Sequence, residues 1–140
     1  MDGYLVRHVA IIPDGNRRWA RARSKAPWLG HKAGIEAYEK ILKKAFDLNI
    51  YCLSFWGMSV DNIEKRDPRE VKYLLGYFAR NLTRALNSKE LVKQNVRVSI
   101  LGEWRTQFPA TLVRLAEKLI SGSKKRTKHV LNLLLCYDGK

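Results

Sequence analysis

Four short apolar runs, separated by longer amphipathic stretches, constrain the possible folds of this chain more than any other feature of its sequence. The runs cover residues 8–12, 50–56, 96–101 and 130–137. A short, continuous apolar run is typical of a strand that is covered on both faces, as in a parallel sheet. We therefore expect four buried strands.

Between these runs, apolar residues recur with the spacing of α-helices that bury one face. We predict such helices around residues 35–46, around 71–86 and over 109–120. Strands that alternate with helices favour an α/β fold with a mostly parallel β-sheet flanked by helices. The positions expected to face inward are Ile35, Tyr38, Ile41, Leu42, Ala45, Phe46, Val71, Leu74, Leu75, Phe78, Leu82, Leu86, Leu112, Leu115, Ala116 and Leu119.

The helix around residues 71–86 carries a start signal. Asp67 can cap it, Pro68 suits its first position, and Glu70 stands at the spacing of a capping box. We expect loops in the stretches that fit neither period, which are residues 22–30, 57–67 and 121–129.

Composition limits the kind of protein and its partners. A chain of 140 residues that is 46% apolar fits one compact domain over residues 1–140. Its net charge of +14 favours anionic partners, which include nucleic acid, phosphorylated small molecules and an anionic membrane surface. Cys52 and Cys136 lie in apolar segments, so we expect buried, reduced thiols. Without a signal pattern or a spanning run, the sequence predicts a soluble cytoplasmic protein that can touch a membrane from one side.

The most informative polar segment, residues 13–16, follows the first apolar run. Ligands of open parallel sheets collect beyond the carboxyl ends of the strands. Gly15 allows a bulky anion to approach the backbone, and the N–H groups of a following helix can donate to phosphate oxygens. The segment therefore predicts a diphosphate site. Positive charge close to it comes from Arg17, Arg18, Arg21 and Arg23.

Asp14 would repel a diphosphate unless a cation lies between them. A Mg²⁺ ion that bridges carboxylate and phosphate oxygens removes this conflict, because Mg²⁺ prefers oxygen ligands. A second interpretation is that Asp14 only caps the helix and pairs with an arginine, since Asp-Gly-Asn is also an ordinary turn sequence. The spacing alone leaves both interpretations open.

The segment HVAIIPDGNRRWA, residues 8–20, resembles the first signature of the cis-prenyltransferases, the undecaprenyl diphosphate synthase family. Four further segments resemble family signatures in the same order. They are WLGHKAG (28–34), FWGMSVDN (55–62) followed by KR (65–66) and REV (69–71), ILGE (100–103) followed by FP (108–109), and NLLLCYDG (132–139). Because these elements span almost the whole chain, it is identified as a member of this family, with an undecaprenyl diphosphate synthase-like fold.

The resemblance implies roles for the matching residues. Asp14 corresponds to the catalytic, Mg²⁺-binding aspartate, and Asn62 belongs to a loop that closes over the reaction centre, where we class it as catalytic. His31 corresponds to a histidine that contacts diphosphate, although it could instead cap its helix. Trp19 is a candidate for the substrate site and also for packing. The implied substrate-binding residues are Gly15, Asn16, Arg17, Arg18, Trp19, His31, Ser59 and Arg66.

The resemblance also implies the reaction. The family condenses isopentenyl diphosphate with an allylic diphosphate and adds C5 units with cis double bonds. Mg²⁺ and cationic side chains would stabilise the departing diphosphate. The growing hydrocarbon would lie between two helices and the sheet. Residues that could line this cleft, or could instead be ordinary core, are Ala37, Ile41, Met58, Leu74, Phe78 and Leu82.

The family's R-x-S-G-E-x-R signature, which supplies isopentenyl diphosphate contacts and a second acidic Mg²⁺ ligand, is absent from this sequence. The C-terminal strands and helices that complete the family's sheet are absent as well. We therefore expect an incomplete cis-prenyltransferase domain that works as a homodimer or with a partner chain that supplies the C-terminal half.

Two other functions remain open. A non-catalytic or diphosphate-binding subunit of a heteromeric prenyltransferase would also carry much of this sequence. A basic nucleic-acid-binding protein would use the charge of +14. Because the basic residues are scattered and no nucleic-acid-binding signature occurs, we expect no nucleic-acid partner.

Overall fold

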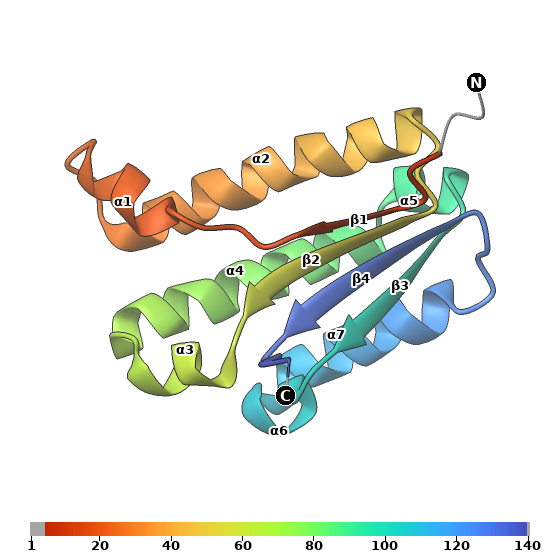
Figure 1. The fold of residues 1–140 in the computed structure, drawn as a ribbon. Helices are drawn as coiled ribbons and strands as arrows, with labels where there is room; N and C mark the ends of the chain where they lie inside the picture. Colours follow the sequence, from red (N-terminus) through yellow and green to blue (C-terminus); the bar gives the residue numbers. More distant parts are fainter. Residues whose placement is uncertain (1–4, 140) are drawn as a thin grey trace.

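A computed structural model describes residues 5–139 and shows four parallel strands with helices packed against them (Figure 1). The strands are β1 (His8–Ile11), β2 (Cys52–Met58), β3 (Val96–Leu101) and β4 (His129–Leu135). They form one sheet in the order β1-β2-β4-β3, and all neighbouring pairs are parallel. The predicted fold class and its four strands are confirmed.

The three predicted helices correspond to the long helices α2, α4 and α7. All three predicted loops are partly helical, because α2 begins inside the first, α3 occupies the middle of the second, and α7 extends to Ser123 in the third. The helices in chain order are α1 (Asn16–Arg21), α2 (Pro27–Asp47), α3 (Val60–Lys65), α4 (Pro68–Leu86), α5 (Lys89–Lys93), α6 (Trp104–Gln107) and α7 (Ala110–Ser123).

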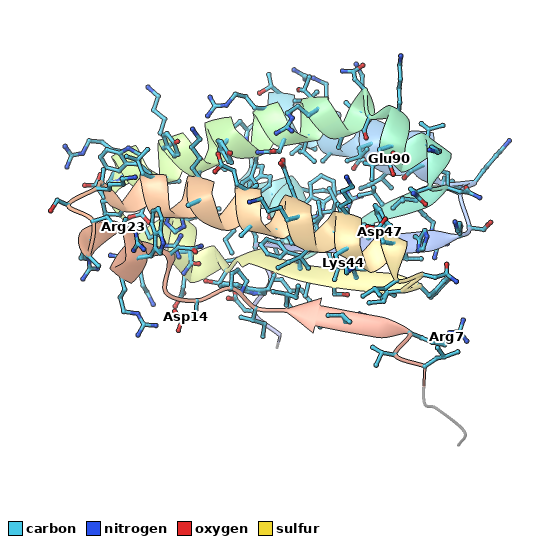
Figure 2. The ribbon with its side chains drawn as sticks, turned by 90° about the horizontal axis from the view of Figure 1, so that it is seen from above. Arg7, Asp14, Arg23, Lys44, Asp47 and Glu90 are labelled. Atoms are coloured by element: carbon cyan, nitrogen blue, oxygen red, sulfur yellow. The ribbon has the colours of Figure 1, made fainter. Side chains whose placement is uncertain are left out.

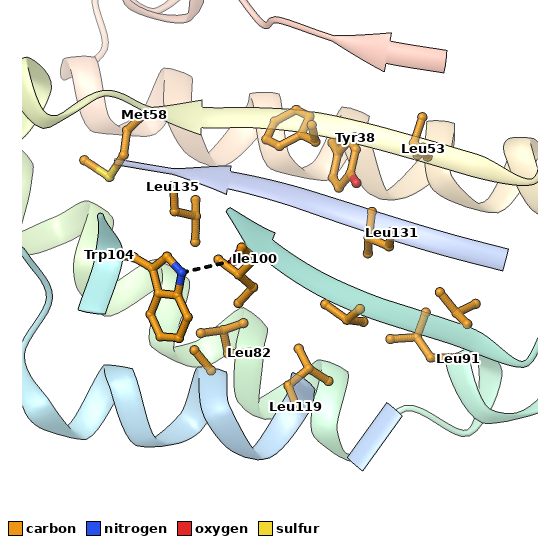
Figure 3. Packing of buried hydrophobic residues seen from close by; sticks show 14 of the residues in the cluster. Tyr38, Leu53, Met58, Leu82, Leu91, Ile100, Trp104, Leu119, Leu131 and Leu135 are labelled. Atoms are coloured by element: carbon orange, nitrogen blue, oxygen red, sulfur yellow. Dashed lines mark hydrogen bonds between the residues drawn. The ribbon is translucent and has the colours of Figure 1, made fainter. Parts of the chain in front are cut away.

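The main apolar core lies between one face of the sheet and these helices. Side chains alternate between the two faces along a strand. In β3, Val96, Val98 and Ile100 are buried in the core, whereas Arg97 and Leu101 are exposed. Figure 3 shows Ile100 of this face packed among side chains from several elements, including Leu82 of α4 and Leu119 of α7.

Trp104 anchors the end of the core beyond β3. Its side chain is fully buried, and its indole Nε1 donates a hydrogen bond to the Ile100 carbonyl at 3.2 Å (Figure 3). Gly102 turns the chain between these two residues with a φ of 114°, in the region that favours glycine. A Cβ at Gly102 would also collide with the carbonyl oxygen of Leu135, so this turn requires glycine.

The opposite face of the sheet carries polar groups. His8 Nε2 lies 2.8 Å from Ser54 Oγ, and the Asn132 amide donates to the same oxygen at 3.0 Å. His8 and Ala10 of β1 are exposed. The expectation that every strand is covered on both faces is therefore wrong for β1, because β1 lies at an edge of the sheet and apolar content alone does not reveal strand order.

The start of α4 is only partly as predicted. Asp67 is the N-cap and accepts a hydrogen bond from the Arg69 N–H at 2.8 Å, and Pro68 opens the helix. Glu70 does not complete a capping box: it is buried, and its carboxylate lies 2.8 Å from His31 Nε2 on α2. The Glu70 carboxylate thus interacts with a residue of another helix, and not with the backbone at the start of α4 as the local pattern predicted.

Both cysteines, Cys52 and Cys136, are buried free thiols as predicted. Burial raises the pKa of Cys136 to about 12, which keeps this thiol protonated at neutral pH. Within residues 5–139, none of the helices combines the length and the apolar character needed to cross a bilayer.

The predicted solvated loop at residues 121–129 contains two buried side chains. Ser123 and His129 are each 1% exposed. The Val98 N–H of β3 donates to Ser123 Oγ at 2.9 Å, and His129 Nδ1 lies 2.7 Å from the Ile50 carbonyl oxygen. The run of Lys and Arg concealed these two structural contacts in the sequence.

Replacing Ser123 with Ala should lower the free energy of unfolding by about 1–3 kcal/mol, because the buried Val98 N–H loses its acceptor. Ser121→Ala is the matched control, since Ser121 is exposed and its hydroxyl donates to a helix carbonyl. Urea unfolding followed by circular dichroism measures both variants. Equal stabilities of the two variants would contradict the role given to Ser123.

Candidate active site

A hollow of about 260 Å³ opens beyond the carboxyl ends of β1 and β2, and we call it the polar pocket. It brings together seven of the predicted site residues: Asp14, Gly15, Asn16, Arg17, Arg18, His31 and Arg66. Its remaining lining residues are Pro13, Arg21, Trp56, Gly57 and Leu74. The sheet position is the one where ligands of parallel α/β folds collect.

Asp14 lies just past the end of β1 (Figure 2), and its side chain is 86% exposed. One carboxylate oxygen accepts from the Gly15 N–H at 2.6 Å, and the other accepts from Arg18 Nη2 at 2.9 Å. The arginine pair expected by the second interpretation therefore exists. The capping role expected for Asp14 is not observed, because the N-cap of α1 is Gly15, at φ 86°, and no side chain caps this helix. The exposed Asp14 carboxylate is accessible to a ligand.

A pair of glycines fixes the turn that carries Asp14. A Cβ at Gly30 would overlap the backbone carbonyl of Asn16, and one at Gly34 would lie 2.7 Å from the Asn16 side-chain amide. The two glycines on α2 thus allow it to lie directly against the start of α1. His31, between them in sequence, lines the polar pocket. This explains physically why a G-H-x-x-G spacing serves such a site.

His31 and Arg66 form one wall of the polar pocket, and the buried carboxylate of Glu70 lies behind them. His31 Nε2 lies 2.8 Å from Glu70 Oε1, and Arg66 Nη1 lies 3.8 Å from the same oxygen. The side chains of His31, Arg66 and Glu70 are 11%, 18% and 5% exposed.

Burial is the largest influence on the pKa values of His31 and Arg66. Burial lowers the pKa of His31 below its ordinary value, although the hydrogen bond that the ring donates to Glu70 acts in the opposite direction. The charges of Arg66 and Arg17 lower this pKa further. Burial also lowers the pKa of Arg66. Within this wall, Arg66 is the cation that faces the buried Glu70 carboxylate, and the further positive charge of the pocket comes from the exposed Arg17, Arg18 and Arg21.

Three predicted site residues do not line the polar pocket in this structure. Ser59 and Asn62 form the capping box of α3: Ser59 Oγ accepts from the Asn62 N–H at 3.2 Å, and the Ser59 N–H donates to Asn62 Oδ1 at 3.4 Å. The Trp19 ring packs against Arg23, whose guanidinium carbon lies 4.4 Å from the ring centroid. The roles of these residues toward substrate remain predictions.

Sequence reasoning missed Trp56, Gly57 and Glu70 as parts of this region. Trp56 Nε1 donates to the Tyr137 carbonyl at 2.9 Å, which ties the end of β2 to the segment after β4. Glu70 stood inside a recognised signature, REV, and this was the available signal. Its role was missed because the capping-box spacing offered a complete local explanation.

An apolar cavity of about 620 Å³ lies next to the polar pocket, between α2, α4 and the sheet. Leu74 lines the polar pocket and Phe78, one turn further along α4, lines the apolar cavity. Of the predicted cleft residues, Phe78 and Leu82 line this cavity, and their contact with a hydrocarbon remains a prediction. Ala37 and Ile41 are exposed, so their assignment to the cleft was wrong: they lie outside the buried face of α2. Other lining residues include Tyr38, Leu42, Phe46, Phe55, Leu133 and Leu135.

The described residues contain no group of three or more His, Cys, Asp or Glu side chains placed to hold a metal ion. Asp14 does provide one accessible carboxylate beside the arginines. Proteins commonly hold Mg²⁺ through one or two carboxylates together with substrate phosphates and water. The residues present therefore fit Mg²⁺ only when a phosphate group accompanies the ion.

Comparison with known proteins defines the class that this fold and site represent. A family model described as "Putative undecaprenyl diphosphate synthase" matches residues 12–140. The chain therefore belongs to this prenyltransferase family. Its fold is that of the undecaprenyl diphosphate synthases.

Named relatives agree with this assignment. The chain is 36% identical over 138 residues to a tritrans,polycis-undecaprenyl-diphosphate synthase (geranylgeranyl-diphosphate specific) of Pyrococcus abyssi, a match that covers 99% of the chain and 52% of that relative. It is 37% identical over 137 residues to dehydrodolichyl diphosphate synthase 2 of Arabidopsis thaliana, covering 97% of the chain and 43% of that relative. The chain thus spans about half the length of the curated relatives it matches.

A solved structure gives the same result in three dimensions. Lavandulyl diphosphate synthase from Lavandula x intermedia, crystallised in complex with dimethylallyl diphosphate, superposes with a TM-score of 0.86 at 30% sequence identity. The superposition covers 95% of this chain and 56% of that structure.

Gly30→Ala should destabilise the protein by about 1–3 kcal/mol, because the new methyl group is forced against Asn16. Gly76→Ala, in the middle of α4 with open space around it, should instead stabilise by about 0.5–1 kcal/mol through its better helix propensity. Thermal or urea unfolding of both variants gives the comparison. Stabilisation by both substitutions would show that α1 and α2 do not touch at Gly30.

Proposed function

We propose that this chain forms the allylic diphosphate half of an enzyme of cis-prenyl chain elongation. The observation that carries the proposal is the polar pocket, where partly buried Arg66 and three exposed arginines outnumber its one lining carboxylate, Asp14, together with a larger apolar cavity one turn further along α4. An allylic diphosphate has the matching division, with a charged head group and an apolar chain. The substrates named for the relatives are diphosphates of this kind.

Binding the head group would use the charges of the pocket. Arg66 is partly buried, so its attraction for a diphosphate is stronger than that of a surface cation, whereas Arg17 is exposed. Arg18 would leave Asp14 and turn to a phosphate oxygen, because their ion pair is exposed and weakly held. The hydrocarbon would extend past Phe78 into the apolar cavity.

The proposed reaction breaks one C–O bond and forms one C–C bond. The allylic C–O bond to diphosphate breaks, the double bond of isopentenyl diphosphate supplies the electron pair for the new C–C bond, and loss of a proton forms the cis double bond. The arginine side chains of the pocket would stabilise the negative charge that develops on the departing diphosphate. When bound to the phosphates, Mg²⁺ would supply further charge neutralisation, with Asp14 as its carboxylate ligand.

We propose that the isopentenyl diphosphate site comes from a further segment, in the same assembly as this chain. The share of each relative that the chain covers supports this. A homodimer or a complex with a partner chain would provide the segment, at a cytoplasmic location with contact to the membrane that holds long polyprenyl products. A diphosphate-binding subunit without catalysis is the alternative function.

Arg66→Gln should weaken the binding of inorganic pyrophosphate to the chain by about tenfold or more, because a partly buried charged donor is lost. Arg69→Gln is the matched control: its side chain is 82% exposed and pairs with Asp67 outside the pocket, so its effect should stay within about twofold. Isothermal titration calorimetry at one fixed ionic strength measures both. If both variants lose the same pyrophosphate affinity, the binding depends only on overall charge, and the proposed site is wrong.

Asp14→Asn should abolish Mg²⁺-dependent condensation of farnesyl or geranylgeranyl diphosphate with labelled isopentenyl diphosphate, while the fold remains intact by circular dichroism. The assay is run with the chain alone and with an added C-terminal half of a full-length relative. Product that forms only with the added half identifies a split enzyme. Diphosphate binding without product in either case supports the alternative function, and unchanged turnover in Asp14→Asn removes this carboxylate from the mechanism.

A further inference from the structure

Glu70 occupies an unusual place for an acidic residue. It lies in the first turn of α4, its side chain is 5% exposed, and one oxygen faces both His31 Nε2 at 2.8 Å and Arg66 Nη1 at 3.8 Å. Both partners line the polar pocket, whereas Glu70 is absent from its lining. Glu70 therefore contacts two residues that line the pocket, but it would not itself contact a ligand bound there.

We infer that Glu70 is a positioning residue, which holds His31 and Arg66 in the orientation that the head group of an allylic diphosphate requires. The inference rests on the proposed function of the polar pocket. Glu70 itself would touch neither substrate nor metal, and would act only through its two partners.

The contact with Glu70 fixes the state of His31. A carboxylate accepts hydrogen bonds, so the proton of a neutral His31 lies on Nε2, which selects one of its two tautomers. The charged and titratable groups around this ring are Glu70 on α4, Arg66 at the end of α3 and Arg17 on α1. Among these, Glu70 is the group that favours the protonated ring, which is the form that binds an anion best.

The negative charge of Glu70 has two opposing effects on anion binding in the pocket. Taken alone, a negative charge behind the pocket repels a diphosphate. Without a counter-charge, however, the partly buried Arg66 would be repelled by Arg17, and both charges would disfavour a protonated His31. The carboxylate therefore aids anion binding only if the order that it gives to these cations outweighs its own repulsion.

The test compares Glu70→Gln, Glu70→Asp and the control Glu36→Gln. Glu36 is exposed on α2 and pairs with Lys32 at 3.9 Å, so its variant removes the same charge without altering the wall. Glu70→Asp keeps the charge at the start of α4 but withdraws the carboxylate by one methylene. Circular dichroism confirms that each variant is folded, and titration calorimetry measures the binding of inorganic pyrophosphate.

We expect both Glu70 variants to bind pyrophosphate about tenfold more weakly than the wild type, because charged hydrogen bonds are lost. Glu36→Gln should bind within about twofold of the wild type. A purely electrostatic role predicts the opposite result, with tighter binding by Glu70→Gln and wild-type binding by Glu70→Asp. Either of these outcomes would overturn the inference.

A second measurement needs no ligand. In a ¹⁵N NMR titration assigned with His31→Gln, the pKa of His31 should fall further below its ordinary value in Glu70→Gln, because the hydrogen bond and charge that raise it are gone. An unchanged titration would overturn the contact between Glu70 and His31. If the wild-type chain binds no pyrophosphate, the proposed function fails, whereas this titration still decides whether Glu70 holds His31.

Discussion

The contact between α1 and α2 is the constraint on which the candidate site depends. Gly30 and Gly34 leave α2 without side chains where Asn16 lies, so the two helix backbones approach each other closely. That approach sets the position of the Asp14–Gly15 turn relative to His31, although Asp14 and His31 belong to different elements. Holding Asp14 in a fixed turn and His31 on a rigid helix in this way lowers the cost of ordering them when a ligand binds.

The sheet and α4 then divide the site into two environments. Trp56 and Leu74 border the polar pocket, whereas their neighbours Phe55 and Phe78 border the apolar cavity. One residue along β2 and one turn along α4 are enough to change from a charged to an apolar surface, because side chains alternate in direction along a strand and repeat every turn along a helix. A ligand with one charged end is thereby oriented by the scaffold itself.

Much of this could be predicted from the sequence, because it follows from local periodicity. The four strands, the three long helices and the Asp67 cap rest on patterns within a few residues of one another. Strand order, the exposure of β1 and the burial of Ser123 depend on contacts between distant segments. Glu70 shows this limit most clearly. Its spacing predicted a helix cap, but its carboxylate instead forms a hydrogen bond with His31, 39 positions away in the sequence.

The edge position of β1 affects more than its burial. An edge strand presents unpaired backbone N–H and C=O groups along its free side, which is a template for a further strand. All strands in this sheet run parallel, so a strand added there in the same direction would also finish near Asp14. Whatever polypeptide docks along this free side would thus deliver its own loop to the end of the molecule that holds the polar pocket.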